Sequence, residues 1–295
     1  MTDVGPEERR RRRRLLLLVS PGVAWIVATY VLPTLLILLY SFLTPRLGGG
    51  VEWRVSLDAY RTLTAADARA SLYNPYVTVL ARSIVWAGFT TAICFVLALP
   101  VALYIHGRRT ALGRYALLIA VMIPFWTSML VRTYALRYLL ANTGPLNGVL
   151  RWLGFEPITL LNSRIAVVIG LVYTALPFMI LPLYAAVARV DPRVLEAGRD
   201  LGANGPQTFV RVFLPLVSAG TVVGCVLVFV LSASQYIVPT LLGGGKVNMI
   251  ANLIELQFGD AFNWPLGSGI AIFFSALTLL GLSVVTAHRR EAQLL

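Results

Sequence analysis

The chain alternates between long apolar runs and polar segments along its 295 residues. The apolar runs cover about residues 15–42, 76–105, 115–130, 165–187, 212–231 and 266–287. A helix needs about 20 consecutive apolar residues to cross a bilayer, and most of these runs are that long or longer. The pattern therefore predicts an all-α integral membrane protein with six transmembrane helices.

Composition supports this interpretation and excludes a soluble domain of the same length. Hydrophobic residues make up 58% of the chain and charged residues 13%, and the mean hydropathy is +0.77. The basic tail at residues 1–14 includes the run Arg9–Arg14, and the apolar run that follows is too long for a cleaved signal peptide. We therefore expect an uncleaved first transmembrane helix and a single transmembrane domain over residues 15–295.

The basic residues predict the orientation in the membrane. Of the 25 arginines and lysines, 15 lie in the N-terminal tail, in segments 106–114 and 189–211, and in the C-terminal tail. Positive charge marks the cytoplasmic side, so both termini and the 189–211 segment are expected there. Topology and contact with anionic membrane lipids thus explain the net charge of +12, and nucleic acid is not expected as a partner.

The polar segment at residues 191–216 predicts two short helices joined by a turn. Asp191 can cap the first helix, with Pro192 at its first position. Gly202 follows the last apolar residue of that helix, Leu201, where a left-handed backbone is needed. The segment is therefore expected to be ordered rather than a plain connector.

The second short helix has its own start and stop signals. Asn204 and Gln207 have the spacing of a capping box, which satisfies free backbone N–H groups at a helix start. Phe209, Val212 and their neighbours would give this helix an apolar face. Pro215 is expected to interrupt it, because proline lacks the N–H that a helix interior requires.

The same segment resembles the EAA loop of ABC importer permeases. Glu196-Ala197-Gly198 is followed by Gly202 and then by Leu214-Pro215, with a glycine in place of the family's second alanine. In that family, the first short helix docks in a groove of an ATPase. The resemblance implies a coupling loop over 189–215, between the fourth and fifth spans, with ATPase contacts at Glu196, Ala197, Gly198, Asp200, Leu201, Gly202 and Ala203. Without the resemblance, the segment would be interpreted as an ordinary cytoplasmic loop.

The resemblance also implies that the driving energy comes from other chains. In ABC importers, two ATPase subunits hold ATP and magnesium, a second homologous permease completes the path, and a solute-binding protein delivers substrate from outside. The implied location is the inner membrane of a bacterium. This chain contains no G-x-x-x-x-G-K-[ST] phosphate loop, so we expect it neither to hydrolyse ATP nor to bind a cofactor itself.

Four further motifs resemble the spermidine/putrescine subgroup of these permeases. They are L-V-R-T-Y-A at 130–135, G-P-L-N at 144–147, L-P-F-M-I-L-P-L-Y at 176–184 and N-W-P-L-G at 263–267. The resemblance implies import of spermidine, putrescine or a related organic cation. Subgroups for opines, amino-acid derivatives and metal or oxyanion complexes share parts of these motifs, so those substrates stay open.

Other classes of membrane protein fit the residues less well. A secondary transporter, the main alternative class, needs an intramembrane carboxylate or histidine for its coupling ion, and the apolar runs offer none of that kind. A signalling or scaffold protein would leave the 189–215 segment without a purpose. Cys94 and Cys225 lie deep in apolar runs, where they are expected to be inert, and the sequence holds no metal-ligand cluster.

Aromatic and polar residues in and beside the spans are the candidates for the substrate path. Aromatic faces attract ammonium groups by a cation–π interaction worth roughly 0.5–2 kcal/mol. The candidates are Trp86, Trp126, Tyr134, Tyr173, Ser232, Ser234, Gln235 and Tyr236, with Glu255 and Asp260 as carboxylates before the last span. The lipid-interface belt and helix packing are equally good explanations for each aromatic residue taken singly.

Overall fold

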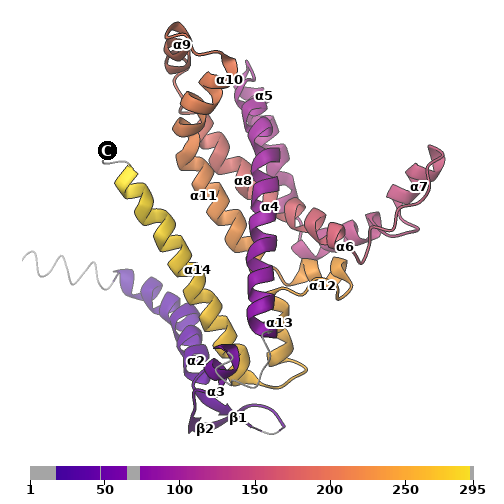
Figure 1. The fold of residues 1–295 in the computed structure, drawn as a ribbon, viewed down its shortest axis with the longest axis vertical. Helices are drawn as coiled ribbons and strands as arrows, with labels where there is room; N and C mark the ends of the chain where they lie inside the picture. The colour runs from indigo at the N-terminus through magenta and orange to yellow at the C-terminus, as the bar shows by residue number, and fades with distance from the viewer. Residues whose placement is uncertain (1–17, 47, 65–73, 293–295) are drawn as a thin grey trace, which may run out of the picture. The chain divides into compact units, whose positions relative to one another are not determined.

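A computed structural model describes residues 18–46, 48–64 and 74–292 (Figure 1). Within this part, the helices that are long and apolar enough to cross a membrane cover Leu18–Tyr40, Pro75–His106, Arg164–Val187, Gly205–Ala233 and Trp264–Ser283. A bent pair, Ala111–Trp126 with Met129–Leu139, gives a sixth crossing if it counts as one span. The structure is therefore that of an all-α membrane protein, as expected, while the run Arg9–Arg14 lies outside the described residues.

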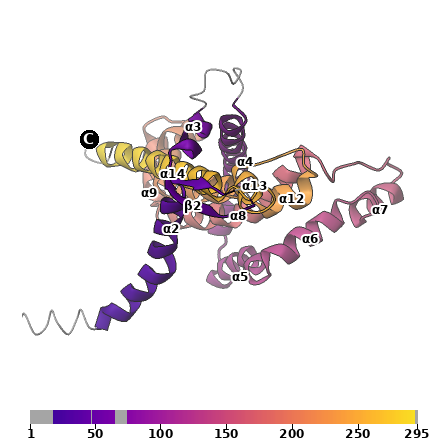
Figure 2. The same cartoon turned by 90° about the horizontal axis from the view of Figure 1, so that it is seen from below.

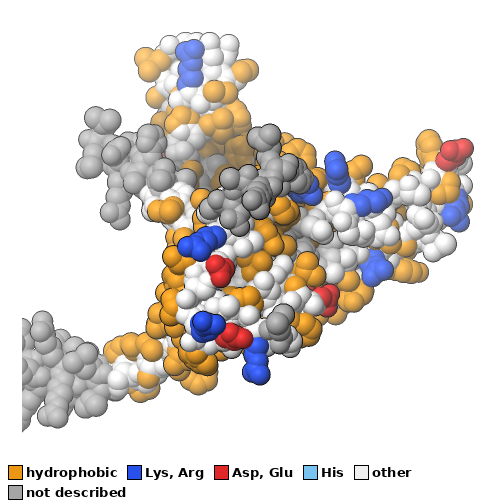
Figure 3. Space-filling view, turned by 60° about the horizontal axis from the view of Figure 1, so that its bottom comes forward, with side chains coloured by type: hydrophobic (Ala, Val, Ile, Leu, Met, Phe, Trp, Pro, Cys, Tyr) orange, Lys and Arg blue, Asp and Glu red, His pale blue; other side chains and the backbone are white. Residues whose placement is uncertain are grey.

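The chain divides into two compact units. One comprises residues 1–74 and 254–277, and the other comprises residues 75–253 and 278–295. Hydrophobic side chains cover much of the surface in Figure 3, and charged side chains are few and scattered. Such a surface suits contact with lipid and with other membrane subunits rather than with water.

Three helices form the core of the second unit and lie side by side in Figure 1: α4 (Pro75–His106), α8 (Arg164–Val187) and α11 (Leu214–Ala233). Small residues allow them to approach closely. A Cβ added at Gly220 of α11 would lie 2.5 Å from the Cβ of Ala186 of α8. Lipid tails are as apolar as the helices, so the hydrophobic effect does not drive helices together within a membrane. Close van der Waals packing of this kind drives their association instead.

A second apolar cluster joins the N-terminal end of α8 to α12 (Ile237–Gly243) and to the start of α13 (Ile250–Phe258). Its buried members are Leu140, Ala166, Val167, Leu171, Val238, Leu242, Val247 and Met249. The backbone N–H of Ile250 donates a buried hydrogen bond of 2.8 Å to Oγ of Ser83 in α4. This bond satisfies one of the free N–H groups at the start of α13.

The third apolar run is not one continuous span, contrary to the expectation for residues 115–130. The helices α5 (Ala111–Met122) and η2 (Ile123–Trp126) end before α6 (Met129–Leu139), whose axis is bent by 94° from theirs. Thr127 between them is extended and Ser128 is not helical, so the run of helical hydrogen bonds is broken there. Figure 2 shows α6 and then α7 (Pro145–Trp152) leading away from α5.

The first unit is built around its apolar helix, which ends in η1 (Val27–Val31) and α2 (Leu32–Tyr40). A polar segment follows this helix. It contains an antiparallel hairpin of β1 (Leu43–Pro45) and β2 (Val51–Val55), followed by α3 (Asp58–Thr64). A Cβ added at Gly269, in the part of α14 (Trp264–Ala292) that belongs to this unit, would lie 3.2 Å from the Cβ of Ala59. The glycine thus allows α3 to pack closely against α14.

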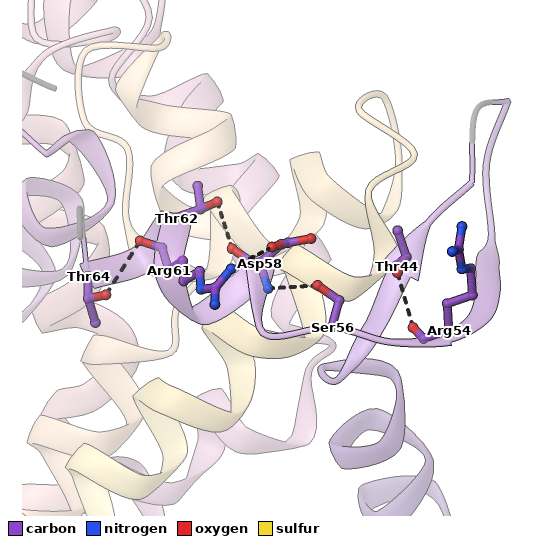
Figure 4. Close-up of polar contacts among 7 residues, drawn as sticks. All are labelled: Thr44, Arg54, Ser56, Asp58, Arg61, Thr62 and Thr64. Atoms are coloured by element: carbon purple, nitrogen blue, oxygen red, sulfur yellow. Dashed lines mark hydrogen bonds and ion pairs between the residues drawn. The ribbon is translucent and has the colours of Figure 1, made fainter. Parts of the chain in front are cut away.

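Short polar contacts order this hairpin and helix (Figure 4). Oγ of Ser56 accepts a hydrogen bond of 3.0 Å from the backbone N–H of Asp58, at the start of α3. Arg61 lies 3.7 Å from the Asp58 carboxylate one turn later, and Thr44 of β1 donates to the carbonyl of Arg54 of β2 at 3.1 Å. The Asp58 and Arg61 side chains are exposed, and those of Thr44 and Ser56 are half-buried, so the contacts fix local geometry and contribute little to overall stability.

Candidate functional site

The two short helices predicted for residues 191–216 are present, at the end of α11 and beside the junction of α4 and α5 (Figure 1). The first is α9 (Pro192–Asp200). The Asp191 side chain accepts a hydrogen bond of 3.0 Å from the backbone N–H of Arg193, and Pro192 occupies the first turn, where its missing N–H costs nothing. The predicted cap is therefore confirmed.

A tight glycine turn ends α9. Gly202 has a φ of +92°, in the region that side chains disfavour, so the predicted left-handed residue is confirmed. The N–H of Gly202 donates to the carbonyl of Arg199 at 2.9 Å, and the N–H of Ala203 donates to the carbonyl of Gly198 at 3.2 Å. This pair of bonds is the Schellman arrangement, which satisfies the last free carbonyls of a helix.

The predicted capping box at the second helix is also confirmed. Oδ1 of Asn204 accepts from the N–H of Gln207 at 3.0 Å, and Oε1 of Gln207 accepts from the N–H of Asn204 at 3.1 Å. The helix α10 (Gly205–Thr208) begins here. Three capping motifs thus fix the path of the backbone between Asp191 and Gln207: the Asp191 cap, the Gly202 turn and the capping box.

The prediction that Pro215 interrupts the second helix was wrong. The helix α10 continues through a π-helical turn, η3 (Phe209–Phe213), directly into α11. In that turn the N–H of Leu214 bonds to the carbonyl of Phe209, five residues back, and the wider turn makes room for the proline ring. The same device precedes Pro33, where the N–H of Leu32 bonds to the carbonyl of Val27.

The residues expected to contact an ATPase differ in exposure. Those on the outer face are exposed, and Leu201 at the tip has 90% of its surface free. Glu196, Ala197, Asp200 and Gly202 belong to this exposed group, whereas Gly198 and Ala203 are half-buried. Exposed apolar residues beside carboxylates give a surface that suits a protein partner.

A cavity of about 280 Å³ lies behind α9, where α4 and α8 end. Its lining comes from α4, from the end of α8, from α9 and from η3, and consists of Leu103, His106, Val187, Val190, Pro192, Leu195, Arg199, Gly205, Thr208, Phe209 and Phe213. Leu195 thus points inward from α9 and was missed by sequence reasoning. The segment from Asp191 to Phe213 therefore packs against the ends of α4 and α8.

The candidate path residues of the second unit lie where helices break. Trp126 ends η2 and is 89% exposed, and Tyr134 lies on α6 beyond the bend. Ser234, Gln235 and Tyr236 form the break between α11 and α12. Helix breaks at membrane depth occur in proteins where they face a cavity or another chain.

Other candidates lie elsewhere in the fold. Trp86 of α4 packs edge-on against Phe89, and Tyr173 is 41% exposed on α8. Ser232 is buried at the end of α11. The exposed carboxylates of Glu255 and Asp260 belong to the first compact unit, whereas the other candidates belong to the second.

Sequence reasoning missed two polar features of the second unit. The Asn252 side chain donates to Oγ1 of Thr240 at 2.7 Å and to the carbonyl of Tyr236 at 3.3 Å, which fixes the segment after α11. Arg132 in α6 has a largely buried guanidinium, which only the three-dimensional packing reveals. Among the described residues, no group of three or more His, Cys, Asp or Glu side chains is placed to hold a metal ion.

Known proteins similar to the chain are transport permeases, although no protein-family profile matches it. It is 39% identical over 275 residues to the spermidine/putrescine transport system permease protein PotB of Haemophilus influenzae, covering 92% of both chains. Identity to PotB of Escherichia coli is 37%, over 92% of this chain and 96% of that one. The inner membrane ABC transporter permease protein YdcU of Escherichia coli is 35% identical over 76% of this chain and 75% of its own length.

The fold resembles solved structures as well. A chain of a bacterial ABC transporter involved in the import of the acidic polysaccharide alginate superposes with a TM-score of 0.72. It is 16% identical, and the match covers 97% of this chain and 98% of that one. A second structure of an alginate ABC transporter, in complex with a periplasmic protein that carries an alginate pentasaccharide, gives a TM-score of 0.69 at 16% identity, over 93% of each chain. At this level of identity, the likeness concerns the fold alone.

Proposed function

This chain belongs to the family of spermidine/putrescine permease subunits of ABC transporters, and we propose that it forms half of the membrane path of a polyamine importer. The observation that carries the proposal is the 39% identity to a named spermidine/putrescine permease across 92% of both chains. The second half is a homologous permease. A solute-binding protein on the outer face delivers spermidine, putrescine or a related organic cation.

The coupling loop transmits the energy of ATP hydrolysis to this chain. We propose that α9 docks in a groove of an ATPase subunit, with the exposed carboxylate of Glu196 and the exposed side chain of Leu201 as its main contacts. ATP and magnesium are held by two such ATPases and not by this chain. The three capping devices keep α9 rigid, so a movement of the ATPase displaces the loop as a body.

A continuous helix leads from the loop to the far side of the membrane. The helix Gly205–Ala233 has 29 residues and is thus roughly 44 Å long. Its outer end is followed by Ser234, Gln235 and Tyr236, which are candidates for the path. A displacement of α9 is therefore transmitted along one continuous helix to the residues that we assign to substrate contact.

Aromatic side chains give the path its affinity for organic cations. Trp126, Tyr134 and Tyr173 are each exposed in the isolated chain, so their rings are accessible to an ammonium group. Glu255 and Asp260 of the first unit are separate candidates, which would attract the cation by their charge. Both termini and the coupling loop lie in the cytoplasm in this proposal, and the β1–β2 hairpin faces outward.

Uptake in intact cells tests the substrate. A strain that lacks this gene should take up labelled spermidine or putrescine more slowly than the parent, and the gene on a plasmid should restore the rate. The matched control is uptake of an amino acid through an unrelated transporter, which should not change. Normal uptake of both polyamines, together with a loss of another solute, would contradict the polyamine assignment and leave the permease assignment in place.

A further inference from the structure

The helix break after α11 leaves two backbone carbonyl groups free. Ser234 and Gln235 lie between α11 and α12 and belong to neither helix. Within the described part of the chain, no group donates a hydrogen bond to the carbonyl oxygen of either residue. Ser234 is exposed and Gln235 is half-buried, so both have accessible surface in the isolated chain. The C-terminal end of a helix also carries a partial negative charge, so this break favours a cation that can donate hydrogen bonds.

The next carbonyl along the chain, that of Tyr236, is held by three donors. It accepts hydrogen bonds from the backbone N–H of Thr240 at 3.2 Å, from Oγ1 of Thr240 at 2.8 Å and from Nδ2 of Asn252 at 3.3 Å. Nδ2 of Asn252 also donates to Oγ1 of Thr240 at 2.7 Å. One asparagine side chain therefore ties the start of α12 to α13.

The Asn252 amide is itself held in a fixed orientation. Its Oδ1 accepts a hydrogen bond of 3.2 Å from the backbone N–H of Met249, while its Nδ2 donates to the start of α12. Nearby, the backbone N–H of Ile250 donates to Oγ of Ser83 in α4. A side-chain amide supplies both an acceptor and two donors, which a carboxylate or a hydroxyl group does not. The start of α13 thus connects α4 to the helix break through directed hydrogen bonds.

Close apolar packing holds another side of α12. A Cβ added at Gly170 of α8 would lie 2.5 Å from Cδ1 of Leu242 and 2.7 Å from Cγ1 of Val238. Such contact sets the distance between α12 and α8, but hydrophobic contact has no preferred direction. The hydrogen bonds of Asn252 orient the peptide groups at the first turn, because a hydrogen bond weakens steeply as it departs from linearity.

We propose that Asn252 is a positioning residue of the substrate path: it orients the break at Ser234–Tyr236 so that the free carbonyls of Ser234 and Gln235 accept hydrogen bonds from an ammonium group of the substrate. The inference rests on the proposed function, which supplies an organic cation as the substrate. An ammonium group has N–H donors and no acceptor, which matches carbonyl oxygens that lack a donor. Unwound backbone carbonyls and helix C-terminal ends bind cations in other transporters. The Tyr236 ring, in a residue that is 37% exposed, is accessible to the same cation.

The ratio of spermidine accumulated to ATP hydrolysed tests this proposal. It would be measured in proteoliposomes that hold the complete importer, as the parent and as the Asn252→Ala, Thr240→Val, Thr240→Ser and Asn248→Ala variants. Asn252→Ala should lower the ratio by about tenfold, because the loss of two hydrogen bonds of ordinary strength shifts the break away from its positioned form. Hydrolysis should continue, since the coupling loop is unchanged, and the concentration of loaded binding protein at half-maximal uptake should stay the same.

The other variants separate positioning from a general loss of structure. Thr240→Val should lower the ratio by a smaller factor, whereas Thr240→Ser keeps the hydroxyl group and should retain the ratio of the parent. Asn248 is exposed and makes no hydrogen bond among the described residues, so Asn248→Ala is the matched control and should have no effect. The double variant Asn252→Ala/Thr240→Val should fall little further than Asn252→Ala, because both changes act on one network.

Two results would overturn the proposal. One is an unchanged ratio in Asn252→Ala, whether uptake and hydrolysis are both kept or fall together. The other is an equal fall in Thr240→Ser and Thr240→Val. The parent complex tests the proposed function separately, since a parent that accumulates neither spermidine nor putrescine contradicts polyamine import whatever the variants do.

Discussion

Gly198 of α9 lies directly against Val212 of η3: a Cβ added to the glycine would be 3.3 Å from Cγ2 of the valine. The same Cβ would also be 3.9 Å from Cγ2 of Thr208. Gly198 stands where the EAA pattern has an alanine, and glycine costs a helix roughly 1 kcal/mol relative to alanine. The close crossing of α9 over η3 gives this departure a physical reason.

Enlarging Gly198 should therefore displace α9. We expect Gly198→Leu to reduce polyamine-dependent ATP hydrolysis by the purified complex by roughly tenfold, because overpacking a close contact costs roughly 1–3 kcal/mol. The Val212→Ala change should restore part of the activity of Gly198→Leu, since the two side chains share one space. Equal activity of Gly198→Leu and the parent would show that α9 does not need this crossing.

The positive φ of Gly202 leads to a second prediction. Gly202→Ala should weaken ATPase association by about 1 kcal/mol or more, and Gly202→Asp should weaken it further, because a Cβ disfavours the left-handed backbone and misdirects α9. Gly205→Ala is the control, since a Cβ there meets no atom within 4 Å and the φ of Gly205 is not positive. Binding of the ATPase to each purified variant measures the effect. Equal loss in Gly202→Ala and Gly205→Ala would assign it to something other than the turn.

Glu196 is expected to act at the ATPase surface. Glu196→Ala should cost roughly 2–5 kcal/mol of docking free energy, because it strands a partly desolvated polar group on the ATPase. Glu156→Ala removes an exposed carboxylate elsewhere on the chain and should leave docking unchanged. The measurement is ATPase binding in detergent, and transport by a fully assembled Glu196→Ala complex at the rate of the parent would contradict this role.

Labelling of single cysteines tests the orientation. In a variant with Cys94 and Cys225 replaced by alanine, a cysteine near Gly49, at the exposed position of Arg46, should react with an impermeant reagent in sealed cells. A cysteine at Asn204 should react only after the cells are opened, because the basic segments 106–114 and 189–211 mark the cytoplasmic side. The reverse pattern would invert the proposed topology.

Local chemistry explains which parts of the structure could be predicted. Caps at Asp191, Gly202 and the Asn204–Gln207 box follow from hydrogen bonds between neighbours in sequence, so the sequence reports them directly. The bend at Thr127–Ser128 lies inside a run that is apolar on average despite Pro124 and these two polar residues, and mean hydropathy does not distinguish a straight span from a bent one.

The wrong prediction at Pro215 and the missed burial of Arg132 have different causes. Proline lacks the N–H of an α-helix in any setting, but a π-helical turn tolerates it, and the wider turn depends on packing around η3. Burial of Arg132 depends on Phe125 and on the bend, which belong to the tertiary fold. The hairpin of β1 and β2 was missed because the segment is short and polar.

Reconstitution of the importer tests the central claim most directly. Proteoliposomes would hold this chain, its homologous permease and the ATPases, with the binding protein, labelled spermidine and ATP supplied on the proper sides. The account predicts spermidine accumulation that requires ATP, the binding protein and this chain, and no accumulation with this chain alone. ATP-driven uptake by the lone chain, or a complete complex that accumulates another solute but neither spermidine nor putrescine, would contradict it.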